Sequence, residues 1–443
     1  MTTNSIAKWQ PVPLPQSNRT TGRLYLQRTP RSSSRLPELD ALRGLMLVGI
    51  VLTHLPTRVS HYANQMLGFI SWAEGFVLIS ALLAGRVYGA LLRQWPLRTL
   101  IKKLWLRSAK LYGYHMALLG VAFTVIASIA VQTQEPVLKG LLDFYLAHRA
   151  VAAVSAALLL YCPPLLDILP MYIVFLLLTP ILLAIGRRWG WKYVLAPSAL
   201  LWFVAQFGLR GFLYASLVRH SGFPIPEQNL GAFNLSAWQF LWVFGLWAGT
   251  EGSPRLLRWF RSRWTIGLSM LLAMTFFVLR YQLIPYFVTH PIDQGWTWVL
   301  FDKWQLGVLR LLNFAALAVL FVALRPYIAR PLARTPLGLL GKHSLEVFCV
   351  HVLFCFAALS LIGSGTEAPV AYQAAILVIA LSGMYVVAYL LSRRKKQASP
   401  APAAIAMRSP YAAQVAIAGR AYRPKFVSFT LYFFVCLFTV FLR

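Results

Sequence analysis

A basic residue and a histidine lie inside the first apolar stretch of the chain, ELDALRGLMLVGIVLTHLP at residues 38–56. Arg43 stands near the start of this stretch and His54 near its end. In a helix these positions differ by about 20° beyond three full turns, so both side chains leave one face, about 16 Å apart along the axis. Because charge inside an apolar helix is costly, this face is predicted to line a site. Alternatively, Arg43 reaches lipid headgroups beside Asp40, and His54 merely ends the helix.

A carboxylate follows in the next apolar stretch, GFISWAEGFVLISALLAGRVYG. The short connection of residues 57–65 makes the two stretches neighbouring antiparallel helices, so Glu74 is expected near the depth of His54. A carboxylate beside a histidine fixes its tautomer and raises its basicity, as a general base requires. The alternative is that Glu74 forms a structural pair with Arg43 or with Arg310.

The composition is that of a polytopic membrane protein rather than a water-soluble one. Hydrophobic residues make up 58% of the 443 residues and charged residues only 12%. The formal net charge is +30, but the Lys and Arg residues cluster between apolar runs, where they orient helices and meet anionic lipids rather than nucleic acid. The four cysteines form no CxxC pair, so neither a metal site nor a disulfide framework is predicted.

The predicted fold is an all-α bundle of transmembrane helices. Runs of about 20 apolar residues indicate ten spans, centred near residues 48, 78, 122, 176, 205, 243, 274, 315, 353 and 381. Alternating clusters of Lys and Arg place both termini in the cytoplasm. Residues 150–161 are too short to span and are predicted to lie at the outer interface, whereas the apolar end of the chain, residues 426–443, is a candidate eleventh span.

This pattern divides the chain into three parts. Residues 1–35 are polar and lack the apolar core of a signal peptide, which predicts a cytosolic N-terminal tail. Residues 36–392 form the transmembrane domain. Residues 393–443 combine a basic linker rich in Pro and Ala with the apolar C-terminal segment.

An arginine and a histidine separated by ten residues in the first span resemble the hallmark of the acyltransferase family 3 superfamily. Residues 38–56 followed by MLGFISWAEGFVLISALLAGRVYG resemble more narrowly its OpgC branch, which is associated with succinylation of osmoregulated periplasmic glucans. Supporting similarity comes from PPLLDILPMYIVFLLLTP, FDKWQLGVLRLLNFAALA and LLGKHSLEVFCVH. The resemblance covers about residues 36–392, and it departs from the family at LISALLAG, where members more often carry a Ser-Gly pair.

The resemblance implies a multi-pass acyltransferase of the bacterial inner membrane. Its donor would be an acyl-CoA, foremost succinyl-CoA, used as a substrate without a bound cofactor or metal, and its acceptor would be a hydroxyl of a periplasmic glucan. Within the catalytic set of His54, Glu74 and Arg43, the histidine would be the general base, and the arginine would lie near the CoA phosphates.

Further residues are expected to bind the substrates. Cations at the inner rim could hold the CoA phosphates as well as Arg43 does, and Arg310 or Arg210 could hold the carboxylate of a succinyl group. Aromatic residues near the outer surface could stack on sugar rings, although they equally fit an ordinary aromatic belt. The inner cations are Arg86, Lys102, Lys103 and Arg107, and the outer aromatic residues are Trp296, Trp298 and Trp304. Asp40 is also included among the expected substrate-binding residues.

Two alternative functions remain open from the sequence. One is transfer of an acetyl or another acyl group to a different glycan of the cell envelope. The other is transport, because Arg, His and Glu inside spans also mark ion and proton pathways. Transporters commonly show paired spans interrupted by Gly or Pro in corresponding halves of the chain, and no such duplication is evident, so acyl transfer is the favoured hypothesis.

Overall fold

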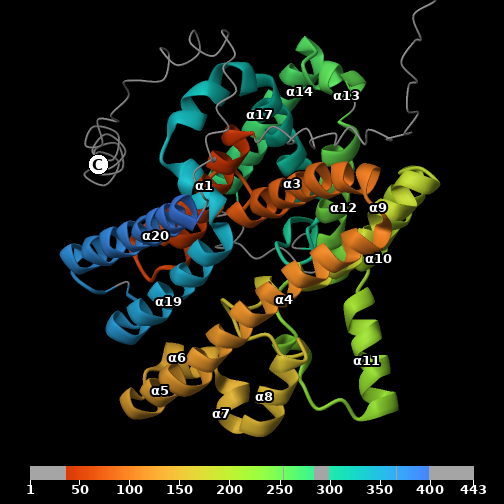
Figure 1. The fold of residues 1–443 in the computed structure, drawn as a ribbon. Coiled ribbons are helices and arrows are strands. Elements are labelled where there is room, and N and C mark those ends of the chain that lie inside the picture. The colour runs from red at the N-terminus through yellow and green to blue at the C-terminus, as the bar shows by residue number, and fades with distance from the viewer. Residues whose placement is uncertain (1–35, 253, 284–298, 366, 399–443) are drawn as a thin grey trace, which may run out of the picture. The chain divides into compact units, whose positions relative to one another are not determined.

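A computed structural model describes residues 36–252, 254–283, 299–365 and 367–398. Every regular element within these ranges is a helix, which confirms the all-α prediction for the described part of the chain. The longer helices (Figure 1) are α1 (Pro37–His54), α3 (Trp72–Gln94), α4 (Leu97–Val121), α9 (Ile168–Arg188), α10 (Lys192–Ala205), α11 (Leu209–Ser221), α12 (Leu235–Glu251), α14 (Arg263–Val278), α17 (Val308–Arg334), α19 (Ser344–Ile362) and α20 (Val370–Ala398).

Short helices connect these elements. They are α2 (Arg58–Ala63), α5 (Ala127–Thr133), α6 (Pro136–Leu141), α7 (Asp143–Ala147), α8 (Arg149–Ala157), α13 (Pro254–Phe260), α18 (Leu337–Lys342) and the 3-10 turn η2 (Glu227–Asn229). Two single-turn π-helices, η1 (Ala122–Ile126) and η3 (Leu279–Leu283), follow α4 and α14. Because η1 bridges α4 and α5, these three form one helix of 37 residues.

Seven of the expected spans are helices long and apolar enough to cross a membrane. They are α3, the helix from α4 to α5, α9, α14 with η3, α17, α19 and α20. The chain is therefore a multi-pass membrane protein, as the composition predicts. The one helix that includes residues from the apolar segment 150–161 is the nine-residue α8, which begins at Arg149. The candidate eleventh span lies outside the described residues.

The other three expected spans differ from a regular transmembrane helix. The first, α1, has 18 residues and carries Glu38, Asp40 and Arg43. The sixth, α12, has 17 residues. The fifth is not one helix, because α10 and α11 meet at an angle of 77°; Gly208 between them has a φ of +79°, a conformation that glycine adopts readily. The count of ten spans stays a prediction.

Glycines let α3 and α12 approach each other closely. Gly85 and Gly89 on α3 and Gly245 and Gly249 on α12 each repeat at a spacing of four, so they form small faces on both helices. A Cβ at Gly249 would lie 2.1 Å from the carbonyl oxygen of Leu82, so no larger residue fits without moving a backbone. Small residues are the usual means of helix packing in membranes, because lipid offers no hydrophobic drive for association.

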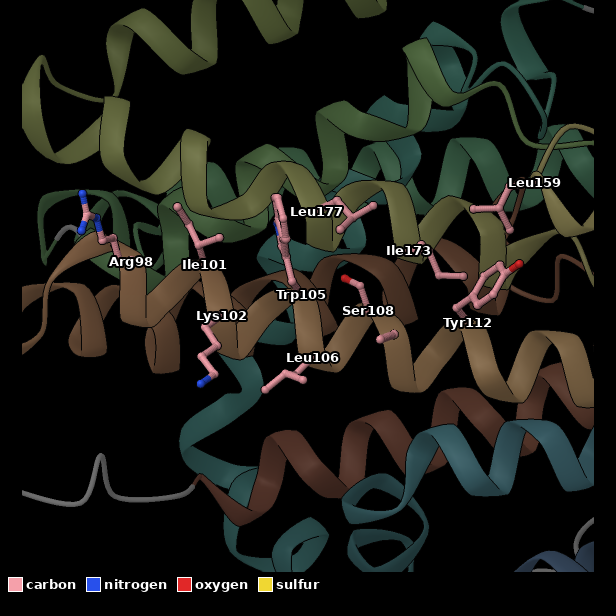
Figure 2. A pocket seen from close by; sticks show the side chains of 11 residues that line it. Arg98, Ile101, Lys102, Trp105, Leu106, Ser108, Tyr112, Leu159, Ile173 and Leu177 are labelled. Carbon is pink, nitrogen blue, oxygen red and sulfur yellow. The ribbon is translucent and has the colours of Figure 1, made fainter.

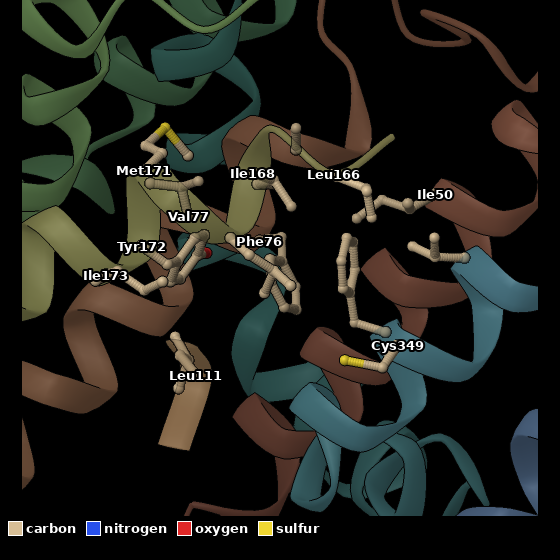
Figure 3. Close-up of a cluster of buried hydrophobic side chains, with 14 of the residues drawn as sticks. Ile50, Phe76, Val77, Leu111, Leu166, Ile168, Met171, Tyr172, Ile173 and Cys349 are labelled. Carbon is tan, nitrogen blue, oxygen red and sulfur yellow. The ribbon is translucent and has the colours of Figure 1, made fainter. Parts of the chain in front are cut away.

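The core that surrounds the candidate site joins α1, α3, α4, α9 and α19 (Figure 3). Buried side chains from all five helices meet there, among them Ile50, Phe76, Leu111, Tyr172 and Cys349. This core orients the inward face of α1, which carries the two residues of the sequence motif.

A second close contact ties α1 to the segment of α18 and α19. A Cβ at Gly341 would lie 1.8 Å from the carbonyl oxygen of Asp40, so α18 packs directly on the backbone of α1. Since α19 begins only two residues after α18 ends, this contact also fixes where α19 starts beside α1.

The chain divides after Ser392 into two compact units, residues 1–392 and 393–443. The candidate site belongs entirely to the first. Only residues 393–398, the end of α20, are described in the second.

Candidate functional site

The two residues of the sequence motif both contact α19. The Nη2 atom of Arg43 donates a hydrogen bond to Ser344 Oγ, and Nδ1 of His54 lies 3.0 Å from Nε2 of His351. The imidazole rings stack at a tilt of 25°, with centroids 5.3 Å apart. The residue number rises in the same direction along both helices, so α1 and α19 run parallel. The face of α1 that carries Arg43 and His54, here called the motif face, packs against α19 at both ends.

A backbone carbonyl determines which nitrogen of each histidine carries a proton. Nδ1 of His351 lies 2.9 Å from the carbonyl oxygen of Phe348, which can only accept, so this nitrogen is the donor. Neutral His351 then has an unprotonated Nε2, which accepts a hydrogen bond from Nδ1–H of His54. His54 therefore keeps a lone pair on Nε2. This is the nitrogen that could take a proton from a substrate.

Glu74 does not form the expected partnership with His54. Its Oε1 accepts a hydrogen bond of 2.5 Å from Nε of Arg310, and neither side chain is exposed. Its Oε2 accepts from the amide and hydroxyl of Ser71, at 2.9 and 2.5 Å, at the start of α3. Among the described residues no hydrogen bond joins Glu74 to His54, so the alternative of a structural pair with Arg310 is the observed one.

The reason for this difference lies in the packing of α17. Arg310 is completely buried, and an unpaired guanidinium in such a place would be strongly destabilising. Its Nη1 also donates to the carbonyl oxygen of Phe301 at 3.3 Å, while Nη2 has no hydrogen-bond partner in the described part of the chain. Glu74 is thus the counter-ion that this arginine requires.

Arg210 is also committed to structural contacts. Its Nη2 donates to the carbonyl oxygens of Glu227 and Gly231, at 2.9 and 2.8 Å, and its Nε lies 3.7 Å from the carboxylate of Glu227. These contacts attach α11 to the segment before α12. Both arginines expected to hold an acyl carboxylate therefore already have partners.

Two cations from different helices lie close together at the inner end of the motif face. Arg107 of α4 lies within electrostatic range of Arg43 and donates a hydrogen bond of 3.3 Å to Tyr88 of α3. The guanidinium of Arg43 also lies 5.9 Å from the ring centre of Phe76. Neither arginine forms a salt bridge within the described ranges. Two neighbouring guanidinium groups without a salt-bridged carboxylate can bind an anion.

The remaining expected residues lie on either side of this face. Asp40 is one turn before Arg43 and within electrostatic range of it. Arg86 lies within electrostatic range of Glu38, to which Arg325 donates a hydrogen bond of 2.8 Å. Lys102 and Lys103 are exposed on α4. None of the hydrogen bonds, salt bridges or ring contacts of the described residues joins these two lysines to Arg43 or His54.

Trp304 lies near the opposite end and is 40% exposed. Its backbone oxygen accepts from Asn234 and from the indole of Trp238, at 3.0 and 3.1 Å, which fixes its position against α12. Its ring lies 4.3 Å below the ammonium of Lys303. Trp296 and Trp298 fall outside the described residues.

Lys303 is a cation that the sequence pattern did not single out. Burial lowers the pKa of its ammonium, while the charges of Glu74 and Asp167 act against this shift. Burial also raises the pKa of Asp167 to about 6, although the amide of Ala232 donates to this carboxyl at 3.2 Å. The ammonium of Lys303 forms no hydrogen bond or salt bridge with any described residue, and it lies within electrostatic range of His54.

Comparison with known proteins supports the resemblance seen in the sequence. A family model described as OpgC protein matches residues 35–396, which is most of the chain. No curated protein and no solved structure gives a match.

Proposed function

Since the chain belongs to the OpgC protein family, we propose that this membrane acyltransferase moves a succinyl group from cytosolic succinyl-CoA to a hydroxyl of a periplasmic glucan. The observation that carries the proposal is the contact between His54 and His351. It leaves Nε2 of His54 unprotonated inside a helix bundle, on the face of α1 that also carries Arg43, and Arg107 of α4 lies within electrostatic range of Arg43.

In this proposal His54 acts first as a base and then as an acid. As the sugar oxygen attacks the thioester carbon, Nε2 of His54 takes the proton of the hydroxyl. The tetrahedral intermediate then expels the sulfur of CoA, which receives that proton from the imidazolium. The products are the sugar ester and CoA, and the histidine returns to its starting state. His351 keeps Nδ1–H of His54 hydrogen-bonded throughout, which holds the ring in the productive tautomer.

The donor would enter from the inner end. Arg43 and Arg107 would bind its phosphates, and the pantetheine arm would cover the distance of about 16 Å along α1 to His54. The inner rim near Arg86 would add a general attraction for the polyanion. Arg43 thus serves binding rather than proton transfer.

The proposal also names the acyl group that is transferred, a succinyl group. A succinyl donor brings a carboxylate into a region of low dielectric, where a cation is needed. Arg310 and Arg210 were expected to supply that cation, but their contacts favour Lys303, which has no salt bridge with the described residues and lies near His54. The exposed ring of Trp304 beside it would stack on the sugar acceptor.

The test uses purified protein, radiolabelled succinyl-CoA and a periplasmic glucan. His54→Ala should lose about 10²–10⁴ in transfer rate yet still bind succinyl-CoA. Arg43→Ala should instead weaken donor binding by about 10- to 100-fold, the value of one charge-assisted hydrogen bond of about 1.5–3 kcal/mol. The matched control is His61→Ala, at an exposed histidine on α2. Substantial transfer by folded His54→Ala protein would exclude the mechanism.

Transport is the second candidate, and one observation favours it. The break between α10 and α11 is a feature of many transporter spans. Only this one broken pair occurs among the described helices, whereas transporters built from repeats carry a corresponding second break. The same assay separates the two functions, because a transporter would leave no label on the glucan.

A further inference from the structure

A long groove runs between α4 and α9, apart from the motif face. Its volume is about 760 Å³, within the range of about 300–1,000 Å³ typical of small-ligand sites. The two helices lie antiparallel beside it, with Ile101 and Trp105 on one wall and Ile173 and Leu177 on the other (Figure 2). Nearly all of the lining is carbon, so the groove suits an apolar occupant.

The groove is basic at one end and has no charged lining residue at the other. Figure 2 shows Arg98 at the basic end, on the side of α4 that faces α9, whereas Lys102 points off the opposite side. An adjoining cavity of about 550 Å³ at the same end is lined by Arg93, Arg187 and Arg188. At the other end lie Leu159 and Tyr112, whose hydroxyl donates to the carbonyl oxygen of Ala157 at 2.9 Å.

The length of the groove matches one leaflet of a bilayer. From Arg98 to Tyr112 the helix rises about 21 Å, compared with about 20–22 Å for one leaflet with its headgroup region, half of a bilayer of about 40–45 Å. The basic end coincides with the cluster of Lys and Arg that the sequence places at the inner surface, where anionic lipid headgroups lie. The groove therefore combines an anion site at one end with an apolar surface about as long as one leaflet is thick.

We propose that this groove binds one acyl chain of an anionic phospholipid, with the headgroup phosphate held by Arg98 and Arg188. The occupant is a lipid rather than the CoA donor, because the amides of a pantetheine arm would lose their hydrogen bonds against a carbon lining. In addition, the cations assigned to the donor, Arg43 and Arg107, do not line the groove. The site is independent of acyl transfer.

The experiment uses Trp105 as the reporter. The protein is reconstituted in phosphatidylcholine vesicles containing a small fraction of phosphatidylglycerol or phosphatidylcholine with brominated chains, which quench tryptophan fluorescence on contact. The difference between the wild-type protein and Trp105→Phe isolates the signal of the groove. Brominated phosphatidylglycerol should quench this component at lower fractions than brominated phosphatidylcholine.

Charge variants test the headgroup site. Each arginine should contribute about 1 kcal/mol near an anionic surface, which is about five-fold in affinity. Arg98→Gln and Arg188→Gln should therefore each reduce the preference for phosphatidylglycerol about five-fold, whereas Arg330→Gln, at an exposed arginine of α17, should not. Equal quenching by both lipids, or equal effects of all three variants, would show an unspecific lipid shell and overturn the proposal. Relief of quenching by free CoA would assign the groove to the donor and overturn it too.

Discussion

At the scale of single residues, the chemistry proposed for this protein depends on a contact between distant parts of the chain. His54 and His351 are 297 positions apart, and their hydrogen bond defines the nitrogen available as a base. The sequence analysis singled out His54, but it offered Glu74 as the partner of this histidine. In the structure Glu74 forms a salt bridge with Arg310 instead, because a buried arginine needs a counter-ion.

The role of His351 as a positioning residue is tested by removing and then replacing its acceptor. His351→Ala frees Nδ1–H of His54, so the ring can adopt the unproductive tautomer and kcat should fall by on the order of 10²–10⁴. His351→Gln supplies an amide oxygen and should restore part of the rate. Both variants should bind succinyl-CoA normally. A higher KM for succinyl-CoA with an unchanged kcat, or an equal kcat for both variants, would indicate that His351 has only a structural role.

Lys303 should determine the choice between acyl donors. Lys303→Met removes the cation proposed to pair with the succinyl carboxylate, so kcat/KM for succinyl-CoA should fall about 10- to 100-fold, the value of a charge-assisted hydrogen bond of about 1.5–3 kcal/mol. The value for acetyl-CoA should change little, because this donor has no second carboxylate. Lys139→Met provides a control with the same change of charge. Equal losses with both donors would contradict the assignment.

At the scale of helices, close approach of backbones joins neighbouring helices of the bundle. The glycine faces of α3 and α12 bring the two backbones together, and the contact of Gly341 with α1 places α18 and α19. Both contacts act on helices that carry site residues, so helix packing and site geometry are coupled. A small change at either interface should therefore be felt at His54.

Gly249→Ala should destabilise the bundle. The added methyl group would lie 2.1 Å from the carbonyl oxygen of Leu82, which forces α12 away from α3 and should cost about 1–3 kcal/mol. Gly267→Ala on α14 is the matched control, because no atom lies within 4 Å of its added Cβ, and alanine is the better helix former by up to about 1 kcal/mol. Thermal unfolding of both variants in one detergent is the measurement. A Tm for Gly249→Ala equal to that of the control would refute the close-packing argument.

At the scale of the whole molecule, the parallel direction of α1 and α19 requires an odd number of membrane crossings between them. The predicted scheme of ten spans has this parity, since it makes them the first and ninth. Clusters of Lys and Arg then assign the sides of the membrane. The anion sites proposed for donor and lipid would both lie at the cytoplasmic side, and the acceptor would enter from the other.

Reporter fusions test this topology. Fusions after residues 65 and 295 should report the periplasm, and fusions after residues 105 and 260 the cytoplasm, because basic loops stay on the inner side. One reversed assignment would break the ten-span scheme. A fusion after Arg443 examines the apolar end of the chain, where a periplasmic signal would establish an eleventh span.

The sequence by itself determined the properties that depend on local pattern. Apolar runs of membrane length specify helices wherever they occur, and a fixed rotation per residue places Arg43 and His54 on one face. Neither result needs knowledge of the neighbouring helices. The family was likewise readable from these local stretches.

Only the tertiary structure decided which partners meet. The pairing of Glu74 with Arg310 rather than His54 and the tautomer set by His351 both depend on helices distant in sequence. The break between α10 and α11 was also missed, because composition reports how much of a segment is apolar but not whether its helix is continuous. Partner choice follows from packing and from the cost of burying unpaired charge, and that cost is defined only once the bundle is assembled.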